Sequence, residues 1–148
     1  MLTIERVAAL HRVVMFADIP GSALAAVARR ATEVEVEGGS ALFAEGAVED
    51  HLFVVVHGRI RIHNGDHTLT ELGPGTTVGE LAALVPEPRS ASATAIERSL
   101  LLRVDKPVLD ELLADRPALT AGIITALVTR LRARRADGAD AVGSTTSP

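Results

Sequence analysis

The sequence contains no cysteine, no tryptophan and no tyrosine, and aromatic residues make up only 2% of its 148 residues. Without cysteine, the chain forms no disulfides and offers no thiolate to a metal ion. The absence of disulfides suits a reducing compartment, so we expect a cytoplasmic protein. A core without aromatic bulk must be built mainly from valine, leucine, isoleucine and alanine.

Excess positive charge is also absent, because the formal net charge is −4 and Lys106 is the sole lysine. An acidic balance disfavours a chain that binds nucleic acid directly. No apolar run approaches the roughly 20 residues that a membrane-spanning helix needs. We therefore expect no membrane span in this chain, which leaves open that it is the cytoplasmic domain of a larger membrane protein.

The N-terminal segment is predicted to be helical. Apolar and half-polar side chains over residues 3–14 recur at helical spacing, at Ile4, Val7, Ala8, His11 and Val14. After a Pro-Gly turn, Ser22 is predicted to cap a second helix that extends to Ala31. These helices, over residues 3–31, precede a change of pattern.

From residue 32 the apolar period becomes two. Val34 and Val36 alternate with glutamates, a pattern typical of a half-buried strand. Further short strand candidates follow up to residue 104, separated by glycine-containing turns such as Asn64-Gly65. Regular short strands with glycine turns predict a sandwich, barrel or jelly roll.

The C-terminal part returns to a helical period. Asp105 is predicted to cap a helix with Pro107 in its first turn. A second helix carries one apolar stripe, which is either core or the seam of a homodimer: Leu119, Ile123, Leu127 and Leu131. We expect one domain over residues 1–135, with C-terminal helices over 105–135, and a disordered tail over 136–148.

The most informative stretch lies between residues 79 and 91. Gly79 permits a tight turn, and the short helical segment after it begins with free amides that suit an anion. Arg89 adds a permanently charged fork that can grip two phosphate oxygens. Glu80 would repel a bare phosphate, so its presence favours a ligand that also donates a hydrogen bond, such as a ribose phosphate.

This stretch, GELAALVPEPRSA, resembles the phosphate-binding cassette of cyclic nucleotide-binding domains, found in catabolite activator proteins, kinase regulatory subunits and cyclic-nucleotide-gated channels. The resemblance covers about residues 3 to 135 and implies a mainly β fold. That fold is a jelly-roll-like β-roll with N-terminal helices, a short cassette helix and two C-terminal helices. It also implies a regulatory sensor whose ligand is cAMP or cGMP, with no further cofactor.

The resemblance assigns a role to each cassette residue. It implies that Glu80 accepts the ribose 2′-hydroxyl and that Arg89 pairs with the cyclic phosphate. The amides around Leu81, Ala82 and Ala91 would complete the cradle beside Gly79, and Ser90 would offer a hydroxyl to the phosphate or to guanine. The same resemblance places Ile62 and Leu72 under the base and Arg130 on the lid helix over the purine.

Other interpretations remain open at this point. Arg89 and Glu80 could form only a surface ion pair, or the cassette could be degenerate and the roll a protein-interaction module. The histidines at 51, 57, 63 and 67 invite comparison with a metal-dependent cupin enzyme, but the paired H-x-H of that family is absent. We expect no enzyme, because no nucleophile–base pair or metal cluster is evident.

Overall fold

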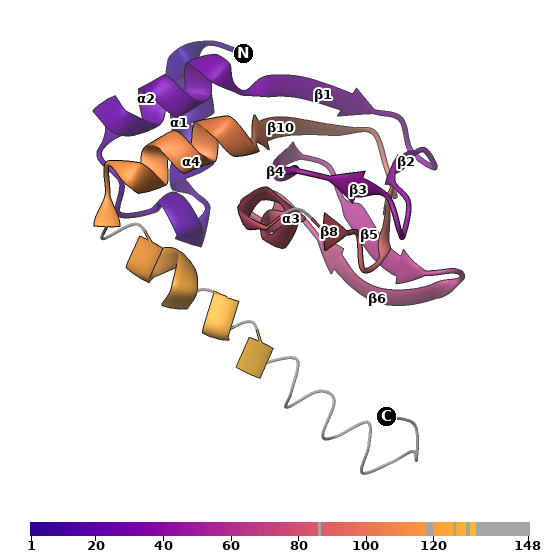
Figure 1. Ribbon diagram of the computed structural model, residues 1–148. Helices are drawn as coiled ribbons and strands as arrows, with labels where there is room; N and C mark the ends of the chain where they lie inside the picture. The colour runs from indigo at the N-terminus through magenta and orange to yellow at the C-terminus, as the bar shows by residue number, and fades with distance from the viewer. Residues whose placement is uncertain (86, 118–119, 126, 130, 133–148) are drawn as a thin grey trace.

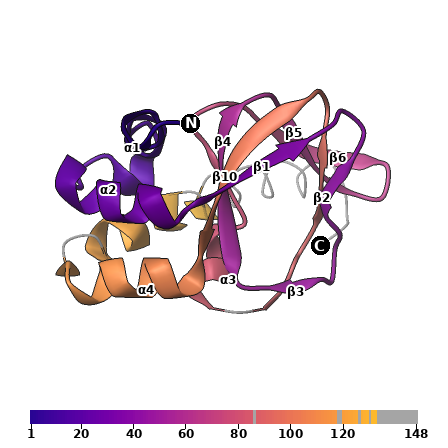
Figure 2. The same cartoon turned by 90° about the horizontal axis from the view of Figure 1, so that it is seen from above.

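The computed structural model describes residues 1–85, 87–117, 120–125, 127–129 and 131–132. Its helices α1, α2 and α4 gather on one side of the strands, as both ribbon views show (Figures 1 and 2). The helical elements are α1 (Thr3–His11), the 3-10 turn η1 (Val14–Phe16), α2 (Gly21–Arg30), α3 (Glu80–Leu84) and α4 (Lys106–Ala114). Residues 120–125 and 127–129 are also helical.

The strands form two four-stranded antiparallel sheets and one two-stranded pair. The first sheet has the order β1-β10-β4-β7, the second has the order β2-β9-β5-β6, and β3 pairs with β8. Their bounds are β1 (Thr32–Val36), β2 (Ala41–Phe43), β3 (Val48–Glu49), β4 (His51–His57), β5 (Ile60–Asn64), β6 (His67–Leu72), β7 (Thr77–Val78), β8 (Glu87–Pro88), β9 (Ser92–Ala95) and β10 (Ser99–Asp105). The predicted mainly β architecture with flanking helices is confirmed.

Strand β4 divides the apolar interior into two clusters, because neighbouring side chains of a strand point to opposite faces. Leu52 and Val54 join a cluster with the helices, whereas Phe53 and Val55 join a cluster between the two sheets. We call the first the helix-side cluster and the second the roll-interior cluster. Both consist mainly of aliphatic residues, as the composition predicts.

Two details of the N-terminal prediction are wrong. Ile4 and Val14 are 75% and 79% exposed, and the buried positions are Leu10 and Val13. The helix ends at His11 and the chain continues into a 3-10 turn, so Val14 no longer falls on the helical period. Ser22 also does not cap α2, which begins one residue earlier, at Gly21.

The C-terminal helices are placed as expected, with one difference at a cap. Asp105 takes the capping position of α4 but makes no side-chain cap hydrogen bond, and its carboxylate lies 3.0 Å from Arg103 Nε. Ile123 is buried in the helix-side cluster and Leu127 packs against it, while Leu131 is exposed. Leu119 and the tail over 136–148 lie outside the described residues.

Helices long and apolar enough to span a bilayer do not occur in the part of the chain that the structure describes.

Candidate functional site

The cassette begins with a glycine whose conformation other residues rarely adopt. Gly79 has a φ of +77°, which turns the chain from β7 into α3. A Cβ atom at this position would lie 2.0 Å from Nη1 of Arg89. Glycine is therefore required here both by the backbone and by the close approach of the guanidinium.

The backbone of Arg89 is fixed by the turn that contains β3. The Arg89 amide donates to the Ala47 carbonyl, and the Gly46 amide donates to the Arg89 carbonyl, both at 2.8 Å. The pairing of Val48 with Pro88 in β3 and β8 continues this ladder. The segment before β4 and the second half of the cassette are thus held together by main-chain hydrogen bonds.

The guanidinium of Arg89 is buried and bonded on all three nitrogens. Its Nε donates to Glu49 Oε1 at 2.9 Å, its Nη1 to the Gly79 carbonyl at 3.1 Å and its Nη2 to the His51 carbonyl at 2.9 Å. It also lies 4.2 Å from the centre of the Phe43 ring, a cation–π distance. Each terminal nitrogen carries a second N–H, so the group keeps the donor geometry that an anion needs.

Glu80 begins α3 and is only 5% exposed. The hydroxyl of Thr77 donates to its Oε2 at 3.3 Å. A surface ion pair between Glu80 and Arg89 is therefore the wrong interpretation: both side chains are buried, and the carboxylate that pairs with Arg89 is that of Glu49. A carboxylate buried to this degree is costly unless it is hydrogen-bonded, and Thr77 supplies one such bond.

The other predicted residues are distributed around this centre. Ser90 is exposed and Ala91 is buried, and the backbone of Leu81 and Ala82 lies in α3. Ile62 and Leu72 are half-buried on the adjacent strands β5 and β6 and pack against the roll-interior cluster. Their predicted role as the wall under the base stays a prediction.

Arg130 lies outside the described residues, so its predicted position over the purine stays a prediction.

Three contacts of Arg89 were not predicted from the sequence. Glu49 and His51 lie 40 and 38 positions before it, and Phe43 comes from β2. In the sequence, these contacts are indicated only by an acidic residue near a glycine-containing turn. Strands β3 and β8 have two residues each, which is too few to show an alternation of apolar and polar residues. His51 is used here through its backbone carbonyl, which any residue could offer.

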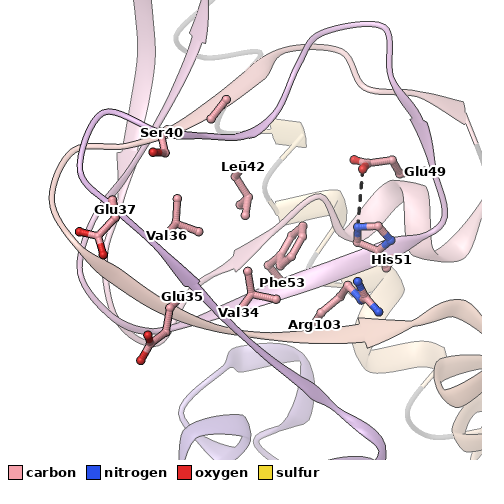
Figure 3. Close-up of a pocket in the computed structure, with 11 residues that line it drawn as sticks. Val34, Glu35, Val36, Glu37, Ser40, Leu42, Glu49, His51, Phe53 and Arg103 are labelled. Atoms are coloured by element: carbon pink, nitrogen blue, oxygen red, sulfur yellow. Dashed lines mark ion pairs between the residues drawn. The ribbon is translucent and has the colours of Figure 1, made fainter.

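The side chain of His51 contacts the same carboxylate. Its Nε2 lies 3.8 Å from Glu49 Oε2, and its ring meets Phe53 edge-on at 5.0 Å between centres. Burial lowers the pKa of His51, with Arg89 also lowering it and Glu49 opposing the shift. Figure 3 shows this pair at one end of a pocket that Arg103 also lines.

A metal centre of the cupin type finds no support among the described residues, where no group of three or more histidine and carboxylate side chains could hold an ion. The ionic contact at the site is instead the pairing of the Arg89 guanidinium with the Glu49 carboxylate.

Comparison with known proteins agrees with this geometry. The sequence model of the cyclic nucleotide-binding domain matches residues 33–116. A "CRP-like cAMP-activated global transcriptional regulator" from Mycobacterium tuberculosis is 31% identical over 90% of this chain and 62% of its own length. The chain thus spans less than two thirds of that curated relative.

Two crystal structures are similar in fold. The N-terminal domain of a transcriptional regulator from Streptomyces coelicolor superimposes with a TM-score of 0.71 at 31% identity, over 85% of this chain and 94% of that one. The catabolite activator protein of Thermus thermophilus gives a TM-score of 0.76 at 26% identity, over 87% of this chain and 62% of that one. With its roll, its cassette and its family match, this chain belongs to the cyclic nucleotide-binding domain family.

Proposed function

We propose that this domain is a regulatory sensor that binds a cyclic purine nucleotide through residues 79–91. The observation that carries the proposal is the buried guanidinium of Arg89, held against Gly79 at the start of α3. A fixed cation at this place neutralises the single negative charge of a cyclic phosphate. The first amides of the cassette helix and the amide of Ala91 would add backbone donors.

The sugar and the base are assigned to neighbouring groups. Glu80, buried where α3 begins, would accept the ribose 2′-hydroxyl. Ile62 and Leu72 would pack under the purine, and Ser90 would offer its exposed hydroxyl to the phosphate or to guanine. Of the two ligands, cAMP is favoured over cGMP, because the Mycobacterium tuberculosis relative is described as cAMP-activated.

The signal would leave the site through the C-terminal helices. The ammonium of Lys106, in the first turn of α4, donates to the carbonyl of Leu84 at the end of α3, at 3.1 Å. A displacement of α3 on ligand binding would therefore move α4 through this hydrogen bond. The C-terminal helix that follows α4, which is the proposed lid, would move with it. The free energy transmitted is limited to the ligand's difference in affinity between the two lid positions.

We also propose that the domain is cytoplasmic, regulatory rather than catalytic, and free of direct contact with nucleic acid. Its output partner would be either a further segment of a longer chain, such as a membrane protein, or a separate protein. Because Ile123 of the predicted seam is buried in the helix-side cluster, a homodimer would form around the exposed Leu131 rather than along the whole stripe.

A second candidate function is supported by one observation. Because Glu49, Gly79 and His51 already accept the hydrogen bonds of Arg89, the roll could serve as an interaction module that binds no nucleotide. Thermal unfolding with excess cAMP or cGMP separates the two functions. A ligand at one hundred times its dissociation constant stabilises the fold by about 2.7 kcal/mol, whereas a non-binding module gives no shift.

The decisive variant is Arg89→Ala. Removing the partner of a buried phosphate costs about 2–5 kcal/mol of binding free energy, which is roughly thirty-fold to several thousand-fold in affinity. Calorimetry measures this loss. Arg98→Ala is the matched control, because it removes an arginine whose side chain is 68% exposed. Unchanged affinity in Arg89→Ala would reject the proposed site.

The sugar role has its own test in the same assay. Glu80→Gln is expected to narrow the preference for the cyclic ribonucleotide over its 2′-deoxy analogue, because the amide is a weaker acceptor than the carboxylate. Equal discrimination before and after the substitution would remove Glu80 from that role.

A further inference from the structure

Four polar or charged residues are buried in the part of the chain that the structure describes, and three of them lie at or next to the cassette. Thr77, Glu80 and Arg89 are 6%, 5% and 5% exposed, and the fourth residue is Ser99. The hydroxyl of Ser99 bonds two main-chain groups, which is a structural use. Thr77 differs from Ser99, because its hydroxyl donates to a carboxylate.

Packing alone does not explain the hydroxyl of Thr77. Valine has the same branched shape at Cβ and buries no polar atom. A buried hydroxyl costs free energy unless it is hydrogen-bonded, and in Thr77 this bond goes to Oε2 of Glu80 at 3.3 Å. The choice of threonine is therefore explained by the acid three residues later rather than by the strand that contains it.

The turn between β7 and α3 brings the two side chains together. Thr77 lies in β7, Gly79 turns the chain with a φ of +77°, and Glu80 is the first residue of α3. A hydrogen bond to one oxygen restricts the rotation of a carboxylate about its terminal bond, which is otherwise broad. Because an ionised carboxylate has about four acceptor positions, the bond from Thr77 leaves it able to accept another.

We propose that Thr77 is a positioning residue for Glu80, and that its hydroxyl fixes the orientation in which the carboxylate accepts the ribose 2′-hydroxyl. This inference rests on the proposed function, since it concerns the sugar contact of that site. Thr77 acts through Glu80 and makes no contact with the ligand. It therefore determines how well the site separates a cyclic ribonucleotide from its 2′-deoxy analogue, and it leaves the phosphate contact of Arg89 unchanged.

The experiment compares two substitutions of Thr77. Calorimetry gives the affinities for cAMP and for its 2′-deoxy analogue, and the ratio of the two is the sugar discrimination of the site. Thr77→Val keeps the shape and removes the hydroxyl, so the discrimination is expected to fall by about threefold to tenfold. Thr77→Ser keeps the hydroxyl and is expected to retain the discrimination. Thermal unfolding shows that each variant is folded.

A neighbouring hydroxyl provides the matched control. Thr76 donates to the carbonyl of Gly73 at 2.6 Å, in the turn before β7. Thr76→Val therefore removes a hydroxyl without touching Glu80, and its discrimination is expected to equal that of the wild type. An equal fall in Thr76→Val and Thr77→Val would mean that any disturbance of this segment suffices, which overturns the specific role of Thr77.

A double variant tests whether Thr77 acts through the acid. Glu80→Ala removes the carboxylate, so adding Thr77→Val to it should change the sugar discrimination no further, because residues that act as one unit are not additive. A full further loss in the double variant would show that Thr77 contributes independently of Glu80, and the positioning role would be wrong.

Failure of this inference is distinguishable from failure of the proposed function. A wild type that discriminates between the two sugars, together with a Thr77→Val variant that discriminates equally well, overturns the role of Thr77 and leaves the sugar contact of Glu80 standing. A fall in thermal stability without a change of discrimination has the same meaning. A wild type that binds neither cAMP nor cGMP overturns both.

Discussion

The two faces of β4 carry similar apolar side chains but pack against different parts of the molecule. Leu52 and Val54 point toward α1, α2 and α4 and are fully buried in the helix-side cluster. Phe53 and Val55 point into the roll, and on the same face the next position toward the strand's start is His51, at a pocket. The helix-side face begins with the apolar Leu52, whereas the roll-interior face begins with His51, next to the Glu49 carboxylate.

This contrast shows how a single strand separates stability from recognition. The helix-side face is closed by three helices and by Ile123, so burial of its apolar side chains contributes free energy to folding. The roll-interior face stops short of a complete core, and the space beyond it holds Arg89, Glu49 and His51. Substitutions on the two faces should therefore have separable effects.

The largest expected effect is on stability, at neighbouring leucines of β10. Leu102 belongs to the helix-side cluster and Leu101 to the roll-interior cluster, and both are fully buried. Leu102→Ala is expected to lower the free energy of unfolding by about 2–5 kcal/mol without changing the nucleotide affinity of the folded protein. Urea denaturation and calorimetry measure the two quantities.

Leu101→Ala is the partner in this comparison. It should be destabilising to a similar degree but should also weaken nucleotide binding, because its cluster includes Ile62 and Leu72. Equal affinities in the two alanine variants would show that the faces are not separable.

The next effect is specific to the cassette. Gly79→Ala places a methyl group on the Arg89 guanidinium and a non-glycine residue at positive φ, which costs about 1–2 kcal/mol. Gly39→Ala is the matched control, since Gly39 has a φ of +86° and nothing within 4 Å of an added Cβ. Both variants should lose stability in thermal unfolding, and only Gly79→Ala should lose nucleotide affinity. Full binding by Gly79→Ala would contradict the contact.

The smallest effect is expected outside both faces. Arg98 pairs with Glu35 at 3.2 Å and with Glu37 at 3.8 Å, and the three side chains are more than 60% exposed. Solvent screens such pairs, so Arg98→Ala should change the free energy of unfolding by no more than about 1 kcal/mol. A larger loss in urea denaturation would mean that this exterior edge contributes as much as a buried contact.

Local patterns predicted the elements whose residues are numerous enough to show a period. The alternation around Val34 and Val36 predicted β1 because one face of that strand is buried, and the turn at Asn64-Gly65 joins β5 to β6. Capping was harder to predict. Asp105 reaches the capping position, but its carboxylate makes no cap hydrogen bond and lies near Arg103, two residues earlier.

The site divides in the same way. Glu80 and Arg89 are recognisable because they lie close together in the sequence at a characteristic spacing, and both prove to be buried. Glu49 is separated from Arg89 by 40 residues and reaches it only through the short pairing of β3 with β8. Strands of two residues show no alternating pattern in the sequence, so Glu49 can be identified as the counter-ion of Arg89 only from the structure.

That short pairing has a practical consequence. Val48 is 71% exposed on β3, opposite Pro88 and one residue from Glu49. A thiol introduced there would be the sole thiol of the chain and could carry a fluorescent dye without competing tryptophan emission. The ladder between β3 and β8 would then act as an optical reporter, translating any displacement of the arginine into a change of colour or brightness.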